Sequence, residues 1–340
     1  MEINNLISII IPCRNEEKFI KNCLSSVLDF KIPSPFQVEV FIVDGISTDK
    51  TVEIVKDFLR INPNFILLRN DAKIQSVAIN IGIAASNGKW IMRLDAHSIY
   101  PEDYLDLCLK TAIETVADNV GGVLITLPGD SSYSALIVQS LTTHKFGVGN
   151  SRFRTDFRGG YTDTVPYGFF KKEIFQKIGF FNEKLVRAQD YEFNKRIVKN
   201  GGMIWLNPSI MINYYNQKSF LKFLNKQLKL DAPYNVYMWY VSPFTFSLRH
   251  AVTGLFTFGI FAGITSFLFS PSISMIFSSV MVMYSFLAIL SALQLSIRYK
   301  KILHLFILPL CFFLFHFIHG LGILIGITKI IFKNSPVNKK

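Results

Sequence analysis

The segment IMRLDAH, residues 91–97, decides how this chain folds. Its apolar start predicts a buried strand, and that strand delivers Asp95 and His97, two residues apart, to its C-terminal end. The carboxyl ends of strands are where α/β sheets bind ligands. We therefore expect the chemistry of the protein directly after this strand.

Upstream of that segment, short β-rich runs alternate with helical runs. This alternation predicts an α/β domain with a parallel, doubly wound sheet. Residues 131–167 are rich in Gly, Ser, Thr and Arg and show little periodicity, so they are expected to form loops over the site. The predicted strands are 7–11, 38–43, 65–68 and 90–94, and the predicted helices are 16–28, 48–59 and 75–85.

The apolar residues are concentrated in the last third of the chain. Its 340 residues are 50% hydrophobic, and segments 251–269, 273–297 and 302–327 contain no Asp, Glu, Lys or Arg. Each can cross a hydrocarbon core of about 30 Å, whereas buried core helices are usually shorter and have a polar face. The predicted regions are a catalytic domain over 1–230, an interfacial connection over 231–249, a membrane domain over 250–333 and a basic tail over 334–340.

The formal net charge of +12 belongs largely to the membrane-proximal half, because no carboxylate follows Asp231. Four lysines within residues 218–229 precede the aromatic stretch 234–240, a mixture suited to anionic headgroups. A solvated helix face is the alternative. Since no nucleic-acid recognition motif accompanies the charge, we expect a lipid bilayer as partner and no nucleic acid.

The termini and loops predict the compartment. The N-terminus has no basic stretch before a hydrophobic segment, so no signal peptide is expected. The four cysteines have neither paired nor metal-site spacing, which indicates reduced, buried side chains. The basic loop 298–301 is predicted to be cytoplasmic and 270–272 outside. The third segment then either spans or is re-entrant, because a span would place Lys329 and the lysines after it outside.

Polar residues also follow the first two predicted strands. The first ends in PCRNE, residues 12–16, and the second in VDG, residues 43–45. An aspartate at position 44 can accept a hydrogen bond from a base or a ribose beside the same crevice. Alternatively, Asp44 is a turn residue and Glu16 is an anion in the first turn of a helix.

Asp95 and His97 can converge on one divalent cation, because an extended i, i+2 pair points to the same side. Carboxylate and imidazole suit Mn²⁺, or Mg²⁺ completed by water and phosphate oxygens. His97 could instead be a hydrogen-bonding turn residue. Further along, Asp190 stands at the start of a helix, where it could accept a proton as a general base, cap the helix or pair with Arg196.

The motifs together resemble the inverting family 2 glycosyltransferases of GT-A fold, over roughly residues 6–208. They occur in the matching order: Asn15-Glu16, DGISTD at 44–49, Asn80-x-Gly82, DAH at 95–97 and QDYE at 189–192. With GYTDTV at 160–165 and the apolar segments, the chain is most similar to membrane-attached succinoglycan-type glycosyltransferases of bacterial exopolysaccharide assembly.

The resemblance assigns roles to these residues. Asp190 would be the catalytic base, and Asp95, with His97, would hold the metal on the donor diphosphate. Two positions depart from the family pattern: His97 replaces the second Asp of the Asp-x-Asp motif, and Gln189 replaces the Glu that commonly precedes the base. The residues implied for nucleotide-sugar binding are Pro12, Asn15, Glu16, Asp44, Asn80 and Asp95.

The resemblance implies a metal-dependent, inverting hexosyltransferase that uses Mg²⁺ or Mn²⁺. We expect a UDP-sugar donor, a polyprenyl-diphosphate-linked saccharide acceptor, and a catalytic domain on the cytoplasmic side of the bacterial inner membrane. The motif QxxRW of processive synthases is not present, which favours one sugar per encounter. The alternative is a catalytically silent nucleotide-sugar-binding transporter or flippase, supported by His304, His316 and His319 within the third apolar segment.

Overall fold

The computed structural model describes residues 5–155 and 158–338. The chain divides into unit 1, residues 1–125 and 156–214, and unit 2, residues 126–155 and 215–340. This division differs from the predicted boundary at residue 230. Residues 126–155 and the segment from 215 onward pack with the apolar helices, so they belong to unit 2.

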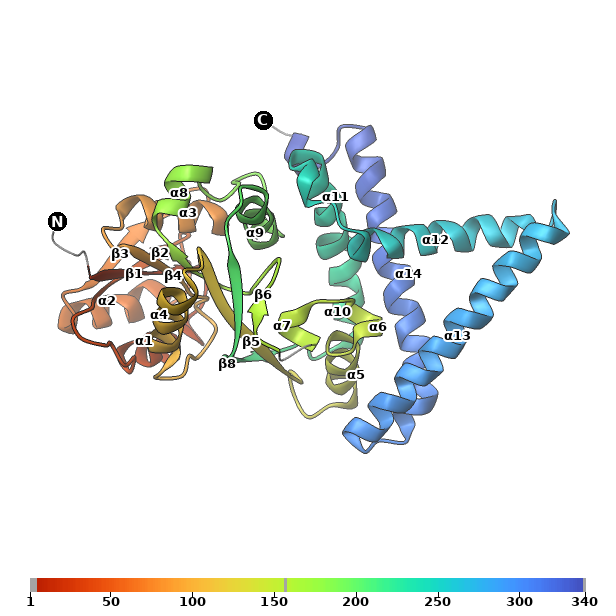
Figure 1. The fold of residues 1–340 in the computed structure, drawn as a ribbon, viewed down its shortest axis with the longest axis horizontal. Helices are drawn as coiled ribbons and strands as arrows, with labels where there is room; N and C mark the ends of the chain where they lie inside the picture. Colours follow the sequence, from red (N-terminus) through yellow and green to blue (C-terminus); the bar gives the residue numbers. More distant parts are fainter. Residues whose placement is uncertain (1–4, 156–157, 339–340) are drawn as a thin grey trace. The chain divides into compact units, whose positions relative to one another are not determined.

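Unit 1 is built on a mixed sheet of eight strands in the order β3-β2-β1-β4-β7-β5-β8-β6, with helices α1 to α4 packed around it (Figure 1). The strands β3, β2, β1 and β4 are parallel, which confirms the predicted α/β class. Beyond them β7 is antiparallel to β4 and β5. The strands are β1 (Leu6–Cys13), β2 (Gln37–Asp44), β3 (Phe65–Arg69), β4 (Trp90–Arg93), β5 (Asn119–Leu127), β6 (Gly160–Tyr161), β7 (Phe169–Lys171) and β8 (Ile204–Tyr215).

The helices of unit 1 follow the expected alternation with strands. Helix α3 lies so close to β1 that a Cβ added at Gly82 would stand 2.5 Å from Cγ2 of Ile10. Glycine at this point of the Asn80-x-Gly82 pair therefore permits the helix to pack on the sheet. The helices are α1 (Ile20–Leu28), α2 (Thr51–Ile61), α3 (Gln75–Ala85), α4 (Tyr104–Thr115), α8 (Glu173–Ile178) and α9 (Gln189–Lys199).

Residues 131–167, predicted as loops over the site, contain the helices α5 (Tyr133–Thr142), α6 (Lys145–Val148) and α7 (Arg152–Thr155) of unit 2. The prediction was wrong for α5. Ser132 accepts a capping hydrogen bond from the amide of Ala135 at 3.2 Å, and the apolar face of the helix packs into the core of unit 2 with α14. Serine and threonine on its other face obscured the helical spacing of Ile137, Val138 and Leu141.

Three helices of unit 2 are long and apolar enough to cross a membrane: α12 (Leu248–Ser266), α13 (Pro271–Tyr299) and α14 (Leu303–Ile331). They match the three predicted segments. A re-entrant third segment would need a turn, whereas α14 continues as one helix through Pro309. Figure 1 shows α12 and α13 joined as a V, with α14 lying across its open end. Large apolar side chains on these helices, such as Phe258 of α12 and Val282 of α13, are exposed, as lipid-facing residues are.

Small residues permit the helices of unit 2 to approach closely. A Cβ at Gly320 of α14 would stand 2.0 Å from the carbonyl oxygen of Thr253 in α12, and one at Gly322 would stand 2.8 Å from Cβ of Ala232. Ala232 begins α11 (Ala232–Val241), which lies within the predicted interfacial connection. This helix therefore packs on α14. The remaining elements are α10 (Phe220–Lys226), the π-helix η1 (Gln227–Asp231), α11 (Ala232–Val241), η2 (Pro243–Thr245) and η3 (Pro336–Asn338).

Candidate active site

The carboxyl ends of β1, β2 and β4 meet at one edge of unit 1, because these strands are parallel. Cys13 pairs with Asp44 across β1 and β2, and Ile10 pairs with Arg93 across β1 and β4. A pocket opens at this edge, and four predicted site residues line it. The lining is Pro12, Cys13, Arg14, Glu16, Gly45, Asn70, Lys73, Ile74, Gln75, Ala78, Asp95, Ala96 and His97.

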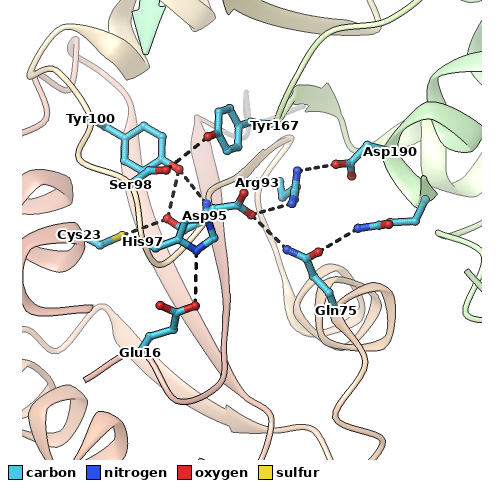
Figure 2. Close-up of polar contacts among 11 residues, drawn as sticks. Glu16, Cys23, Gln75, Arg93, Asp95, His97, Ser98, Tyr100, Tyr167 and Asp190 are labelled. Atoms are coloured by element: carbon cyan, nitrogen blue, oxygen red, sulfur yellow. Dashed lines mark hydrogen bonds and ion pairs between the residues drawn. The ribbon is translucent and has the colours of Figure 1, made fainter. Parts of the chain in front are cut away.

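Asp95 is held in place by three side chains (Figure 2). Its Oδ1 accepts hydrogen bonds from Nη2 of Arg93 at 2.6 Å and from Nε2 of Gln75 at 3.1 Å. Its backbone amide donates to the hydroxyl of Tyr100 at 2.7 Å. Because both side-chain donors bond to Oδ1, Oδ2 is the oxygen of Asp95 that the pocket can use for a ligand.

Asp190 lies in the first turn of α9, which begins after Ala188 in a left-handed conformation, φ 62°. Its Oδ2 accepts from Nη1 of Arg93 at 2.9 Å, and its Oδ1 is buried without a hydrogen-bond partner among the described residues. Burial raises the pKa of Asp190, while the charge of Arg93 opposes that increase. The side chain of Asp190 is 33% exposed, and a partly buried carboxylate with one unpartnered oxygen is equipped to accept a proton.

Arg93 joins these two aspartates from the end of β4. Arg93 is 3% exposed, so its guanidinium charge lies in the interior of unit 1. Burial opposes that charge, yet Asp190 and Asp95 raise the pKa of Arg93 above its ordinary value. The guanidinium also lies over the ring of Tyr167, with 5.7 Å between Cζ and the ring centroid.

His97 stands at the opening of the pocket, with half of its side chain exposed. Its Nδ1 lies 3.4 Å from Oε1 of Glu16, and this interaction raises the pKa of His97 against the opposing effect of burial. Glu16 is therefore a partner of His97 at the pocket wall. Nε2 is the ring nitrogen that remains for a ligand.

The pocket offers few ligands for a divalent cation. Within residues 5–155 and 158–338, no group of three or more His, Cys, Asp or Glu side chains could hold a metal ion. The pocket offers Oδ2 of Asp95 and the imidazole of His97. Mg²⁺ keeps several waters and is usually bound by one or two carboxylates together with substrate phosphates. The residues present fit a cation that binds together with a diphosphate.

Asp44 and Asn15 connect the loops that follow β1 and β2. Both carboxylate oxygens of Asp44 accept from Ser47, its hydroxyl at 2.5 Å and its backbone amide at 3.0 Å. Asn15 adopts φ 56°, and its Oδ1 accepts from the amide of Thr48 at 2.8 Å. These contacts show a turn role for Asp44, its contact with the nucleotide stays a prediction, and both residues stabilise the pocket wall.

Asn80 lies apart from the other predicted pocket residues, on a face of α3 beside the segment that precedes α9. Its Nδ2 donates to the carbonyl of Phe181 at 2.9 Å, and its Oδ1 accepts from the amide of the same residue at 3.0 Å. Nδ2 also donates to Glu183 at 2.9 Å. These contacts make Asn80 a support of the chain that leads to Asp190.

Several residues of the site were missed from the sequence. Arg93 carried a signal, because a charged residue in the otherwise apolar strand WIMRL is rarely buried without a partner. Asn70 and Lys73 follow β3, whose carboxyl end lies at the same edge as the others. Gln75 carried no local signal, since its partners Asp95 and Gln189 are distant in sequence.

A parallel sheet with a polar pocket at its strand ends, an aspartate in that pocket and a second aspartate on a later helix define a glycosyltransferase of GT-A fold. The model of glycosyl transferase family 2 matches residues 8–179, and the chain belongs to this family.

Individual relatives agree with this family. A dolichyl N-acetyl-α-D-glucosaminyl phosphate 3-β-D-2,3-diacetamido-2,3-dideoxy-β-D-glucuronosyltransferase of Methanococcus voltae is 29% identical over 96% of this chain and 98% of its own. The succinoglycan biosynthesis protein ExoA of Rhizobium meliloti is 31% identical over 61% of this chain and 62% of its own. The mannosyltransferase PcManGT of Pyrobaculum calidifontis, solved with GDP-Man and Mn²⁺, shares the fold with a TM-score of 0.63 and 15% identity, over 97% of this chain and 88% of its own.

Proposed function

We propose that this protein transfers a hexose from a nucleotide sugar to a lipid-linked saccharide, with inversion at the anomeric carbon. The observation that carries the proposal is the arrangement at Arg93. It holds a pocket aspartate, Asp95, and a helix-borne aspartate, Asp190, through one oxygen each, and the other oxygen of Asp190 is buried without a partner among the described residues.

In the proposed reaction, Oδ1 of Asp190 accepts the proton of the acceptor hydroxyl. That hydroxyl oxygen forms a bond to the anomeric carbon as the bond from this carbon to the diphosphate oxygen breaks. The electron pair leaves with the nucleoside diphosphate, and attack from the opposite face inverts the anomeric configuration. Asp95, with His97, would hold the divalent cation, which would neutralise charge on the leaving diphosphate.

The pocket residues suit a nucleotide sugar. Arg14 and Lys73 supply positive charges for a diphosphate, while Pro12 and Glu16 form the wall beside β1. In this proposal Asn15 and Asp44 act by holding the loops of the pocket, and Asn80 acts by supporting the chain before α9. A UDP-hexose is the donor that we place first.

The acceptor is proposed to be a polyprenyl-diphosphate-linked saccharide. The support comes from α12 to α14, which could span a membrane, and from the exposed residues Lys218, Lys222 and Lys229 that precede them. The name of the Methanococcus voltae relative describes a dolichyl-phosphate-linked sugar as its acceptor. We infer that the protein resides in the cytoplasmic membrane with unit 1 on the cytoplasmic side.

The test is the release of nucleoside diphosphate by the detergent-purified protein. A panel of UDP-, GDP- and dTDP-sugars is incubated with Mg²⁺, Mn²⁺ or EDTA, with and without a polyprenyl lipid extract. We expect release from one sugar that requires metal and is stimulated by lipid. Binding of a donor without release from any member of the panel would contradict the proposal and favour a silent binding domain.

A further inference from the structure

Five side chains and the backbone between two neighbouring residues form a closed ring in unit 1. Nε2 of Gln189 donates to Oε1 of Gln75 at 2.9 Å, and Nε2 of Gln75 donates to Oδ1 of Asp95 at 3.1 Å. Arg93 bonds to Asp95 at 2.6 Å and to Asp190 at 2.9 Å (Figure 2). Because Gln189 and Asp190 are consecutive in α9, the ring closes through the helix backbone.

We propose that Arg93 and the amide pair Gln75–Gln189 are positioning residues that couple the metal-binding end of the donor pocket to the catalytic base. The inference rests on the proposed function. The ring takes one oxygen from each carboxylate and orients the other. Oδ2 of Asp95 would then be left for the cation, and Oδ1 of Asp190 for the acceptor hydroxyl.

The chemistry of arginine suits this role. Its planar guanidinium presents separate N–H groups in fixed directions, so Nη1 and Nη2 can each hold one carboxylate, whereas lysine offers a single point charge. Nε of Arg93 is buried with no hydrogen-bond partner in the described chain. The two aspartates and the ring of Tyr167 therefore set the orientation of the guanidinium.

The hydrogen bonds of the Gln75–Gln189 pair run in one required direction, from Gln189 to Gln75 and from Gln75 to Asp95. Oδ1 of Asp95 needs a donor, so Gln75 must present its NH₂ group there and leave its carbonyl oxygen to accept from residue 189. An ionised glutamate at position 189 cannot donate that hydrogen bond. The amide of Gln189, which is 5% exposed, can donate it. This hydrogen bond gives a structural reason for glutamine at the position where the family commonly has Glu.

The test separates metal binding from turnover in the full-length protein in detergent. Mn²⁺ affinity is measured by electron paramagnetic resonance with UDP or GDP present and no donor sugar, and turnover is measured at saturating Mn²⁺. For Arg93→Lys we expect Mn²⁺ affinity and turnover each to fall about tenfold or more, as for supports of metal ligands. Asp190→Asn should lower turnover while leaving Mn²⁺ affinity within about twofold of the wild-type value, since the amide oxygen still accepts from Arg93.

The matched control is Arg196→Lys. Arg196 is another largely buried arginine of unit 1, and it pairs with Glu192 at 2.5 Å and bonds to the carbonyl oxygens of Ile178 and Phe180. Its variant should melt at a lower temperature but bind Mn²⁺ within about twofold of wild type, because it touches neither aspartate of the ring. This outcome would separate positioning from general loss of stability.

A folded Arg93→Lys protein with wild-type Mn²⁺ affinity and turnover would overturn the proposal. If that variant does not fold, Gln189→Met keeps both ion pairs and removes only the donor to Gln75. It should bind Mn²⁺ about threefold more weakly, and wild-type affinity would overturn the role of the amide pair. A wild-type protein that binds no Mn²⁺ with either nucleotide would contradict the metal in the proposed function itself, whatever Arg93→Lys does.

Discussion

The two units bury polar side chains for different purposes. In unit 1, Arg93 bonds to Oδ2 of the half-buried Asp190, and the buried Oδ1 atom has no partner among the described residues. In unit 2, the buried His304 has both ring nitrogens engaged, Nδ1 with the hydroxyl of Tyr133 at 2.7 Å and Nε2 with Ser140 at 3.2 Å. We assign the unpartnered oxygen of Asp190 to a substrate, whereas the two hydrogen bonds of His304 join α14 to α5.

The other histidines of α14 follow the second pattern. Nδ1 of His316 bonds to the hydroxyl of Tyr284 at 2.8 Å, and Nδ1 of His319 bonds to the hydroxyl of Thr253 at 2.8 Å. Together the three histidines connect α14 to α5, α13 and α12. The transporter alternative relied on these residues, and their pairing supports a packing role instead.

The largest effect on turnover is expected for Asp190→Asn, which replaces the carboxylate of the proposed base by an amide. An amide cannot accept the proton of the acceptor, so turnover should fall roughly 10²- to 10⁴-fold, the usual contribution of a general base. The assay is initial rates of sugar transfer at saturating donor, with thermal unfolding as the control for folding. A folded variant with near-normal turnover would remove Asp190 from the chemistry.

Asp95→Asn should have the next effect, on cation binding. We expect Mn²⁺ affinity in the presence of UDP or GDP to fall roughly 10- to 100-fold, and His97→Ala to have a smaller effect because His97 is half exposed and shared with Glu16. EDTA should abolish turnover in the wild type. Equal affinities in Asp95→Asn and wild type would place the cation elsewhere.

The pH dependence should follow the burial of Asp190. Burial raises its pKa above the ordinary value of 3.8, and only the ionised carboxylate accepts a proton. Turnover should therefore be full above the raised pKa and fall about tenfold per pH unit below it. The measurement is turnover against pH at saturating substrates. An acid limb centred at or below 3.8 would contradict the buried-base assignment.

The smallest effect on turnover is expected in unit 2. Tyr133→Phe leaves Nδ1 of the fully buried His304 without its hydroxyl partner, at a cost of about 1–3 kcal/mol of stability. Thermal unfolding should detect this loss, while turnover per folded molecule stays at the wild-type level. A loss of turnover comparable with that of Asp190→Asn would contradict the assignment of His304 to packing and of Asp190 to catalysis.

Local sequence patterns predicted the parts of unit 1 that local physics determines. Strand and helix spacing located β1 to β4 and α3, and the strand-end rule placed Asp95 and His97 in the pocket. The same spacing of apolar residues was missed in α5, where serine and threonine obscured it.

The ring could not be predicted in this way, because it depends on tertiary contacts. Gln75 and Gln189 are 114 positions apart, and neither has a neighbour in sequence that signals the other. Asp44 shows a contact that is local in sequence. Ser47, three residues later, donates to both of its oxygens, which is the predicted turn role, and a contact between Asp44 and the nucleotide stays a prediction.

The proposed mechanism is a single displacement in which Asp190 is the base. The anomeric configuration of the product tests it most directly. The donor found in the release assay is supplied with a lipid-linked acceptor, and the new linkage is examined by NMR before any further reaction. We predict a configuration opposite to that of the donor sugar. A retained configuration would contradict the mechanism, because one in-line attack by the acceptor hydroxyl cannot produce it.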